Sequence, residues 1–192
     1  RLGRVFDEVP DIADSDATNH AITTIHGNVE FRNVRMKYAP NLPFAIGDEN
    51  GGISFTIKAG ETIGIVGETG SGKSTLVKLV PRLFNHTDGE VLIDGQPINT
   101  IPIHTLRSAI AIVPQEAFLF SMNIADNIRF GKPNASMDEV VEASIIAQMH
   151  ENVKGFPEGY ATVVGERGVT LSGGQKQRTA IARAVLCQPQ II

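Results

Sequence analysis

The stretch from Gly67 to Ser74 restricts the fold of this chain more than any other feature. It fits the pattern G-x-x-x-x-G-K-[ST] in full. The apolar run Ile63–Val66 precedes it and predicts a buried strand, and the pattern over Thr75–Phe84 predicts a helix after it. Glycines let successive backbone N–H groups surround an anion, while a lysine adds positive charge and a serine hydroxyl suits magnesium. We therefore expect a loop that binds the phosphates of a nucleotide, rather than a plain glycine turn. Its expected nucleotide-binding residues are Gly67, Glu68, Thr69, Gly70, Ser71, Gly72, Lys73, Ser74 and Thr75.

A second glycine motif opens the last predicted helix, which extends from about Gly174 to Leu186. Its residues are Leu171, Ser172, Gly173, Gly174 and Gln175. Two consecutive glycines at a helix start expose backbone N–H groups to an anion. The same residues also fit an ordinary helix cap, with Ser172 as the capping residue. Local physics alone leaves both interpretations open.

Taken together, the two motifs resemble the ATP-binding cassette (ABC) transporter family, whose signature sequence is LSGGQ. The resemblance extends from about Asn28 to Ile192. It implies an α/β fold: a P-loop NTPase (RecA-like) core with a partly parallel sheet, a small antiparallel β part, and an α-helical subdomain over about 116–170. Residues 1–27 would then be the end of an upstream helix and a linker, and residues 28–192 an ABC ATP-binding domain that is incomplete at its C-terminus.

The resemblance also assigns roles to single residues. Lys73 and Gln115 would be catalytic, Ser74 and Gln115 would contact Mg²⁺, and Tyr38 would stack on the adenine of ATP. The five signature residues would contact the ATP held by a partner domain. A half-buried strand tyrosine and a surface glutamine are the structural alternatives for Tyr38 and Gln115.

Several features resemble exporters that fuse membrane and ATPase parts in one polypeptide. They are the helical spacing of apolar residues over 1–9, the sequence Phe118–Ser121, the sequence Pro157–Tyr160, and the loop Gly165–Gly168. In that loop a solvated charge pair of Glu166 and Arg167 is the alternative. The resemblance implies an ATP-hydrolysing motor domain at the cytoplasmic face of a membrane. Its partners would be a second ABC domain, in a homodimer or heterodimer, and a transmembrane domain of the same polypeptide.

The chain departs from the family pattern at two places. It ends at Ile192, before the positions of the family's magnesium aspartate, general-base glutamate and switch histidine, so we expect this fragment alone to lack ATPase activity. The loop Asn41–Gly52 is longer than usual, and its glycines and proline predict only a turn. Two other functions stay open, a soluble ABC ATPase and a regulatory module that binds nucleotide without turnover. The 55 residues between Gln115 and Leu171 are too few for the long coiled coil of repair ATPases.

Composition excludes some classes of partner. Seventeen basic and 21 acidic residues give a net charge of −4 with no block of like charges, which argues against nucleic acid. The single cysteine, Cys187, excludes an internal disulfide. No apolar run reaches the roughly 18 residues of a membrane span.

Periodicity predicts the remaining elements. Strands are expected over Val29–Val34 and Ile53–Ile57, and a hairpin over Glu90–Ile98 that turns at Asp94 and Gly95. Helices are expected over Asn123–Phe130 and from Met137 to about Val153. Ser136 and Glu139 are expected to form a capping box at the start of the longer helix. The polar segment Asp11–Thr24 predicts a linker without regular structure.

Overall fold

A computed structural model describes residues 10–165 and 170–192. The expected end of an upstream helix over 1–9, and Glu166, Arg167 and Gly168 of the predicted exporter loop, lie outside these residues. The chain divides into two compact units, Arg1–Arg107 and Ser108–Ile192.

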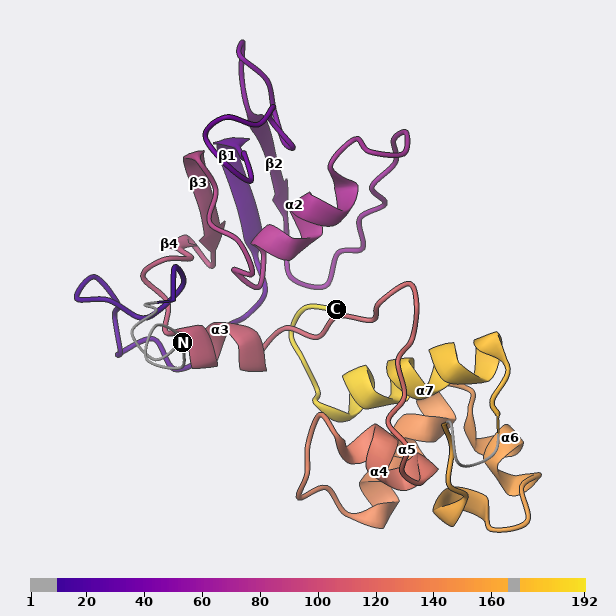
Figure 1. Cartoon of the computed structure of the whole chain (residues 1–192). Helices are drawn as coiled ribbons and strands as arrows, with labels where there is room; N and C mark the ends of the chain where they lie inside the picture. Colours follow the sequence, from indigo (N-terminus) through magenta and orange to yellow (C-terminus); the bar gives the residue numbers. More distant parts are fainter. Residues whose placement is uncertain (1–9, 166–169) are drawn as a thin grey trace, which may run out of the picture. The chain divides into compact units, whose positions relative to one another are not determined.

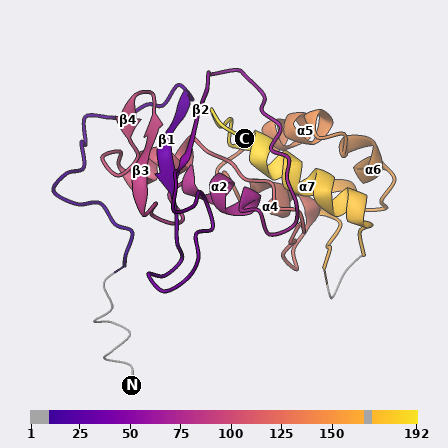
Figure 2. The same cartoon turned by 90° about the horizontal axis from the view of Figure 1, so that it is seen from above.

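The first unit contains a four-stranded antiparallel sheet with strand order β2-β1-β3-β4 (Figures 1 and 2). Its strands are β1 (Val29–Arg35), β2 (Ile53–Ile57), β3 (Asp88–Ile93) and β4 (Gln96–Pro97). Phe31 of β1 lies opposite Phe55 of β2, and their rings stack with centroids 4.6 Å apart. The described residues of this unit also form the helix α2 (Lys73–Leu79) and all but the last residue of α3 (Ile103–Ser108).

The strands expected over Val29–Val34 and Ile53–Ile57 and the hairpin over Glu90–Ile98 are confirmed. Asp94 and Gly95 turn the chain between β3 and β4 with φ angles of 52° and 76°, the left-handed conformation that a tight two-residue turn requires. Val29, Phe31 and Val34 of β1 are buried in the core, and the register of the strand shifts between Phe31 and Val34. Local turn chemistry and strand periodicity therefore suffice to specify this part of the sheet.

Two expectations around the phosphate loop were wrong. Residues 63–66 form no strand, because a strand needs a hydrogen-bonded neighbour and none of β1 to β4 pairs with this segment. The segment is not buried either, since Val66 is 96% exposed. The following helix ends at Leu79 and not at Phe84, because Pro81 has no backbone N–H to continue the helical hydrogen bonds and Arg82 adopts a left-handed φ of 51°. Among the described residues, parallel pairing is confined to a bridge between Ile110 and Ile191.

The segment before β1 has no helix or strand from residue 10 to residue 28, as expected, but two carboxylates attach it to the first unit. Asp94 accepts hydrogen bonds from the backbone N–H groups of His26, at 2.6 Å, and Asn28, at 2.9 Å. Asp14 accepts one from the N–H of Ile103 at the start of α3, at 2.9 Å. This segment is therefore held to the body of the unit at two separate points.

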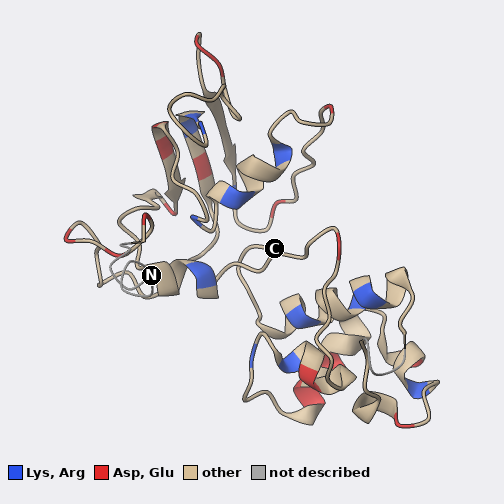
Figure 3. Ribbon diagram, viewed as in Figure 1, with Lys and Arg blue, Asp and Glu red and all other residues tan. Residues whose placement is uncertain are grey.

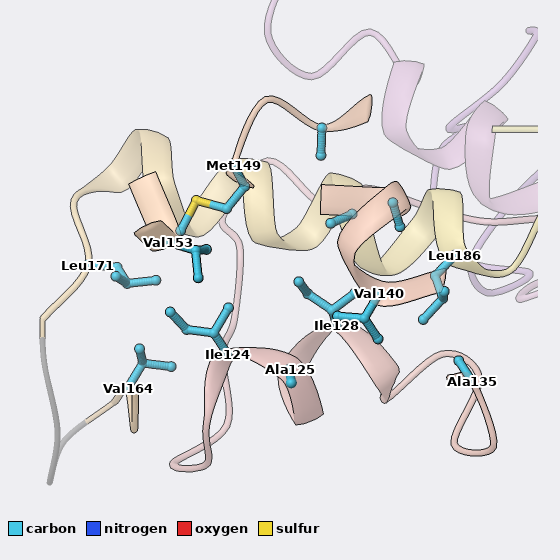
Figure 4. Packing of buried hydrophobic residues seen from close by; sticks show 13 residues of the cluster. Ile124, Ala125, Ile128, Ala135, Val140, Met149, Val153, Val164, Leu171 and Leu186 are labelled. Atoms are coloured by element: carbon cyan, nitrogen blue, oxygen red, sulfur yellow. The ribbon is translucent and has the colours of Figure 1, made fainter. Parts of the chain in front are cut away.

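The second unit is helical, and its core lies where α7 packs against α4 and α5 (Figures 1 and 4). The helices are α4 (Ile124–Arg129), α5 (Met137–Ile146), α6 (His150–Lys154), the short 3₁₀ helix η1 (Gly159–Ala161) and α7 (Gly173–Leu186). Ile124, Ile128, Val140 and Met149 are fully buried in this core. The expected helices over Asn123–Phe130 and Gly174–Leu186 are confirmed within a few residues.

The expected continuous helix from Met137 to about Val153 is wrong. Its first part, α5, begins with the predicted capping box, in which Ser136 and Glu139 each bond the other's backbone N–H. The chain then breaks at Gln148, which adopts a φ of 57°, and α6 restarts at His150. The break lets Met149 enter the core, where it is fully buried.

Candidate functional site

The phosphate loop wraps around the ammonium group of Lys73. The Nζ of Lys73 donates hydrogen bonds to the carbonyl oxygens of Gly67, at 2.7 Å, and Glu68, at 2.6 Å, and lies 3.4 Å from Oγ of Ser71. A cation at the centre of a loop of backbone dipoles is a suitable point charge for phosphate oxygens. The loop residues before Gly72 are all exposed, so the loop is accessible to a ligand.

Gly72 is required by geometry. It caps the start of α2 with a φ of 86°, and a Cβ placed on it would lie 2.0 Å from the carbonyl oxygen of Ala45. Any larger residue would displace backbone. The contact also gives the unusually long loop Asn41–Gly52 a structural role, because Ala45 belongs to this loop and packs directly on the phosphate loop.

Tyr38 lies next to the helix that follows the phosphate loop. Its hydroxyl is 2.7 Å from the Oγ1 of Thr75, and its ring meets the ring of Phe84 edge-on, with centroids 5.1 Å apart. The residue is 50% exposed. The structure thus brings Tyr38, Thr75 and the phosphate loop together in the first unit.

The signature residues form the N-terminus of α7 in the second unit. The Oγ of Ser172 accepts a hydrogen bond from the N–H of Gln175, and the side chain of Gln175 accepts one from the N–H of Ser172. This is a capping box, so the local interpretation of Ser172 as a cap is confirmed. Leu171 is buried, whereas Ser172, Gly173 and Gly174 are exposed and can meet a ligand outside the unit.

Gln115 is exposed in the second unit, in an irregular segment between Pro114 and the aromatic residues Phe118 and Phe120. Nε2 of Gln177, in α7, donates a hydrogen bond to the carbonyl of Pro114, which ties this segment to the signature helix. A cavity of about 580 Å³ lies close by, and Phe118, Gly165 and Leu171 are among its lining residues.

Sequence reasoning missed Asn127, the side chain that holds this segment. Asn127 is fully buried in α4, and its amide nitrogen donates to the carbonyl oxygens of Phe120, Met122 and Asn123 at 3.0–3.2 Å. Its Oδ1 accepts from the N–H of Phe120 at 2.9 Å. Nε of Arg183 donates to the backbone carbonyl of Asn127, and burial lowers the pKa of Arg183. No local sequence pattern marks an asparagine in a short helix as the residue that binds the backbone of a preceding loop.

The residues expected to contact magnesium fit that ion by their chemistry. Ser74 offers an exposed hydroxyl oxygen and Gln115 an exposed amide oxygen, both of the hard type that Mg²⁺ prefers. The described part of the chain has no group of three or more His, Cys, Asp or Glu residues that would hold a metal by itself. That pattern suits an ion that takes most of its ligands from nucleotide phosphates and water.

Basic and acidic residues are interspersed within both units (Figure 3). On β1 and β3, for example, Arg32 lies within 4 Å of Glu30 and of Glu90. Within residues 10–165 and 170–192, no helix has the length and apolar character needed to cross a membrane.

The antiparallel sheet, the phosphate loop and the helical unit define a P-loop nucleotide-binding domain of α/β class. Residues 51–192 match the sequence profile described as ABC transporter. The chain is 44% identical over its whole length to ABC transporter B family member 16 of Arabidopsis thaliana, of which it covers 15%. It is 45% identical to Heavy metal tolerance factor 1 of Caenorhabditis elegans, again over the whole chain and over 24% of that protein.

A solved structure, that of a bacterial Atm1-family ABC exporter with ATP bound, matches 98% of the chain and 32% of its own length. The TM-score is 0.88 and the sequence identity 38%. The chain belongs to the ABC transporter family. The Arabidopsis relative is a transporter by name, and the solved structure is that of an exporter. The chain spans about a quarter or less of the two curated relatives described above.

Proposed function

We propose that this chain is the ATP-binding and ATP-hydrolysing motor domain of an ABC exporter, which couples nucleotide-driven dimerisation to transport of a substrate across a membrane. The phosphate loop around Lys73 carries this proposal, because it holds an ammonium group beside exposed backbone, and that combination suits the negative charge of a triphosphate. Residues 28–192 would form the ATP-binding domain, with its helical subdomain over about 116–170. The relatives include a transporter and an exporter by name. They therefore favour neither a soluble ABC ATPase nor a regulatory module that binds nucleotide without hydrolysing it.

Each site residue has a chemical task in this proposal. Lys73 neutralises the outer phosphates, Tyr38 stacks on the adenine, and Gln115 orients the attacking water. Ser74 and Gln115 would hold Mg²⁺, which neutralises phosphate charge when bound. Catalysis of phosphoryl transfer depends mainly on positioning and electrostatic stabilisation, which these groups supply.

The proposed protein partners follow from the exposed surfaces of the second unit. Ser172, Gly173 and Gly174 present backbone N–H groups to the ATP of a second ABC domain, in a homodimer or heterodimer. The cavity beside Phe118 and Gly165 would receive the transmembrane domain of the same polypeptide at the cytoplasmic face of the membrane. Interspersed charges within each unit favour these partners over nucleic acid (Figure 3).

Replacing Lys73 by alanine tests the proposal. We expect affinity for a labelled ATP analogue to fall at least about tenfold, since a charge-assisted hydrogen bond is worth about 1.5–3 kcal/mol. Lys78→Ala is a matched control, because Lys78 is an exposed lysine at the other end of the same helix. Equal affinities for Lys73→Ala, Lys78→Ala and the parent would refute the assignment of the loop.

Gly174→Asp tests the action of the signature across a dimer. A Cβ at Gly174 has no neighbour closer than Nη1 of Arg178, at 3.5 Å, so the aspartate fits and α7 stays folded. The negative charge would oppose the partner's ATP, so the complete protein should lose ATP-dependent dimerisation while a single domain keeps its affinity for ATP. Sedimentation in a hydrolysis-blocked background measures this, and intact dimerisation would refute the role.

We also propose that the 192-residue polypeptide alone has no appreciable ATPase activity. None of its residues matches the glutamate that the family uses as general base, and loss of such a base costs about 10² to 10⁴ in rate. Phosphate release should be compared with that of a polypeptide extended beyond Ile192, with circular dichroism on both. Equal activity of the two folded polypeptides would contradict the proposal.

A further inference from the structure

The hydroxyl of Tyr38 provides a link between two parts of the proposed ATP site. It forms a 2.7 Å hydrogen bond with the Oγ1 of Thr75, in which either hydroxyl can donate. Thr75 directly follows the proposed magnesium residue Ser74 and is only 7% exposed, so its position is fixed by the packing of α2. The tip of the Tyr38 side chain is therefore tied to the helix that begins in the phosphate loop.

A second contact restrains the ring of Tyr38. The ring of Phe84 meets it edge-on, at an interplanar angle of 89° and a centroid distance of 5.1 Å. Edge-to-face contacts of this kind are favourable because the positive ring edge meets the negative ring face. A tyrosine side chain has only two rotatable angles that place the ring, so one anchor at the hydroxyl and one beside the ring together define its plane.

The restrained ring is still accessible, because Tyr38 is half exposed. A flat aromatic surface held beside a phosphate loop matches a ligand in which a heterocyclic base is joined to phosphates. Holding the ring in place before binding reduces the entropy lost when the base stacks on it.

We propose that the hydrogen bond between Tyr38 and Thr75 preorganises the Tyr38 ring as the stacking surface for the base of ATP and couples that surface to the phosphate loop. Thr75 is in this respect a positioning residue, which acts on the base through Tyr38. The inference rests on the proposed function, and it adds a role for the tyrosine hydroxyl that stacking alone does not need.

Tyr38→Phe tests it, because phenylalanine keeps the ring and removes the anchor. Affinities of the 192-residue chain are measured for ATP and for inorganic triphosphate, both with Mg²⁺. We expect Tyr38→Phe to weaken ATP binding about three- to tenfold, the range for loss of one net hydrogen bond, and to leave triphosphate binding within twofold. Tyr160→Phe is the matched control, since it removes the hydroxyl of the chain's other tyrosine, in the second unit.

The two hydroxyls should also depend on each other. In a Thr75→Val background, Tyr38→Phe should have no further effect on ATP affinity, because the hydrogen bond is already lost. Thr75→Ser keeps a hydroxyl and should restore the sensitivity to Tyr38→Phe. Circular dichroism melting of each variant confirms that α2 remains folded.

The outcomes separate the inference from the function on which it rests. If Tyr38→Phe binds ATP as tightly as the parent while Lys73→Ala does not, the inference is overturned and the proposed function stands. Equal weakening of ATP and triphosphate binding also overturns it, because the hydroxyl would then act on the phosphates and not on the base. A parent chain that binds neither ligand overturns the proposed function itself.

Discussion

Replacing Asn127 by alanine should lower the free energy of unfolding of the second unit by about 2–4 kcal/mol. The substitution leaves the N–H of Phe120 without its acceptor, and an unpaired part-buried donor costs about 1–3 kcal/mol. The carbonyl oxygens of Phe120 and Met122 keep other donors, the N–H groups of Met122 and Val164. Loss of the amide's own bonds to those oxygens therefore adds only about 1 kcal/mol.

The two tyrosines of the chain make the second unit observable separately. Fluorotyrosine labelling gives one fluorine NMR signal from Tyr38 in the first unit and one from Tyr160 in the second, and each can be followed in a urea titration. Asn134→Ala is the control, because Asn134 is exposed. If Asn127→Ala shifts the Tyr160 midpoint no more than Asn134→Ala does, the buried amide does not hold this segment.

Two further predictions concern the first unit. Gly72→Ala should weaken binding of an ATP analogue at least about tenfold, since the added Cβ meets the carbonyl oxygen of Ala45 and a left-handed alanine costs about 1–2 kcal/mol. Gly60→Ala is the control, because the exposed Gly60 is also left-handed but has open space around it. Burial by itself would raise the pKa of Asp94, but hydrogen bonds from the backbone N–H groups of His26 and Asn28 hold it below its ordinary value of 3.8. The carboxylate therefore stabilises the fold above that ordinary value and loses this effect as the pH falls through its lowered pKa. The protection factors of the amides at residues 26–28, which compare their exchange with the intrinsic rate at the same pH, should fall there in the parent and already be low at neutral pH in Asp94→Asn.

Sequence reasoning succeeded where a structure depends on neighbouring residues only. The hairpin at Asp94 and Gly95, the capping box at Ser136 and the cap at Ser172 are specified by residues one to three positions apart. It failed for residues 63–66, because whether an apolar run becomes a strand depends on a hydrogen-bonded neighbour elsewhere in the chain. Asn127 was missed for the same reason, since its three carbonyl acceptors belong to a loop whose path no local pattern encodes.

The break between α5 and α6 shows a third kind of failure. The N–H of Met149 bonds the carbonyl of Ser144 and the N–H of Gln148 bonds that of Ile145, the paired bonds of a Schellman motif. Glycine usually occupies the left-handed position of that motif, but here Gln148 does so with a φ of 57°. The sequence therefore lacks the glycine that marks a helix end. Burial of Met149 in the core of the second unit compensates the strain.

Gln148→Gly should consequently stabilise the second unit by about 1 kcal/mol, because glycine adopts the left-handed conformation without the penalty of a Cβ. The hydrogen bond from Nε2 of Gln148 to the carbonyl of Ile145 is exposed and 3.3 Å long, so its loss offsets little of this gain. Gln148→Ala removes that bond but keeps the strain, and should leave stability nearly unchanged or slightly lower. The Tyr160 signal in urea measures both variants. A Gly variant no more stable than the Ala variant would mean that the left-handed backbone at Gln148 is not strained, and that burial of Met149 has no strain to compensate.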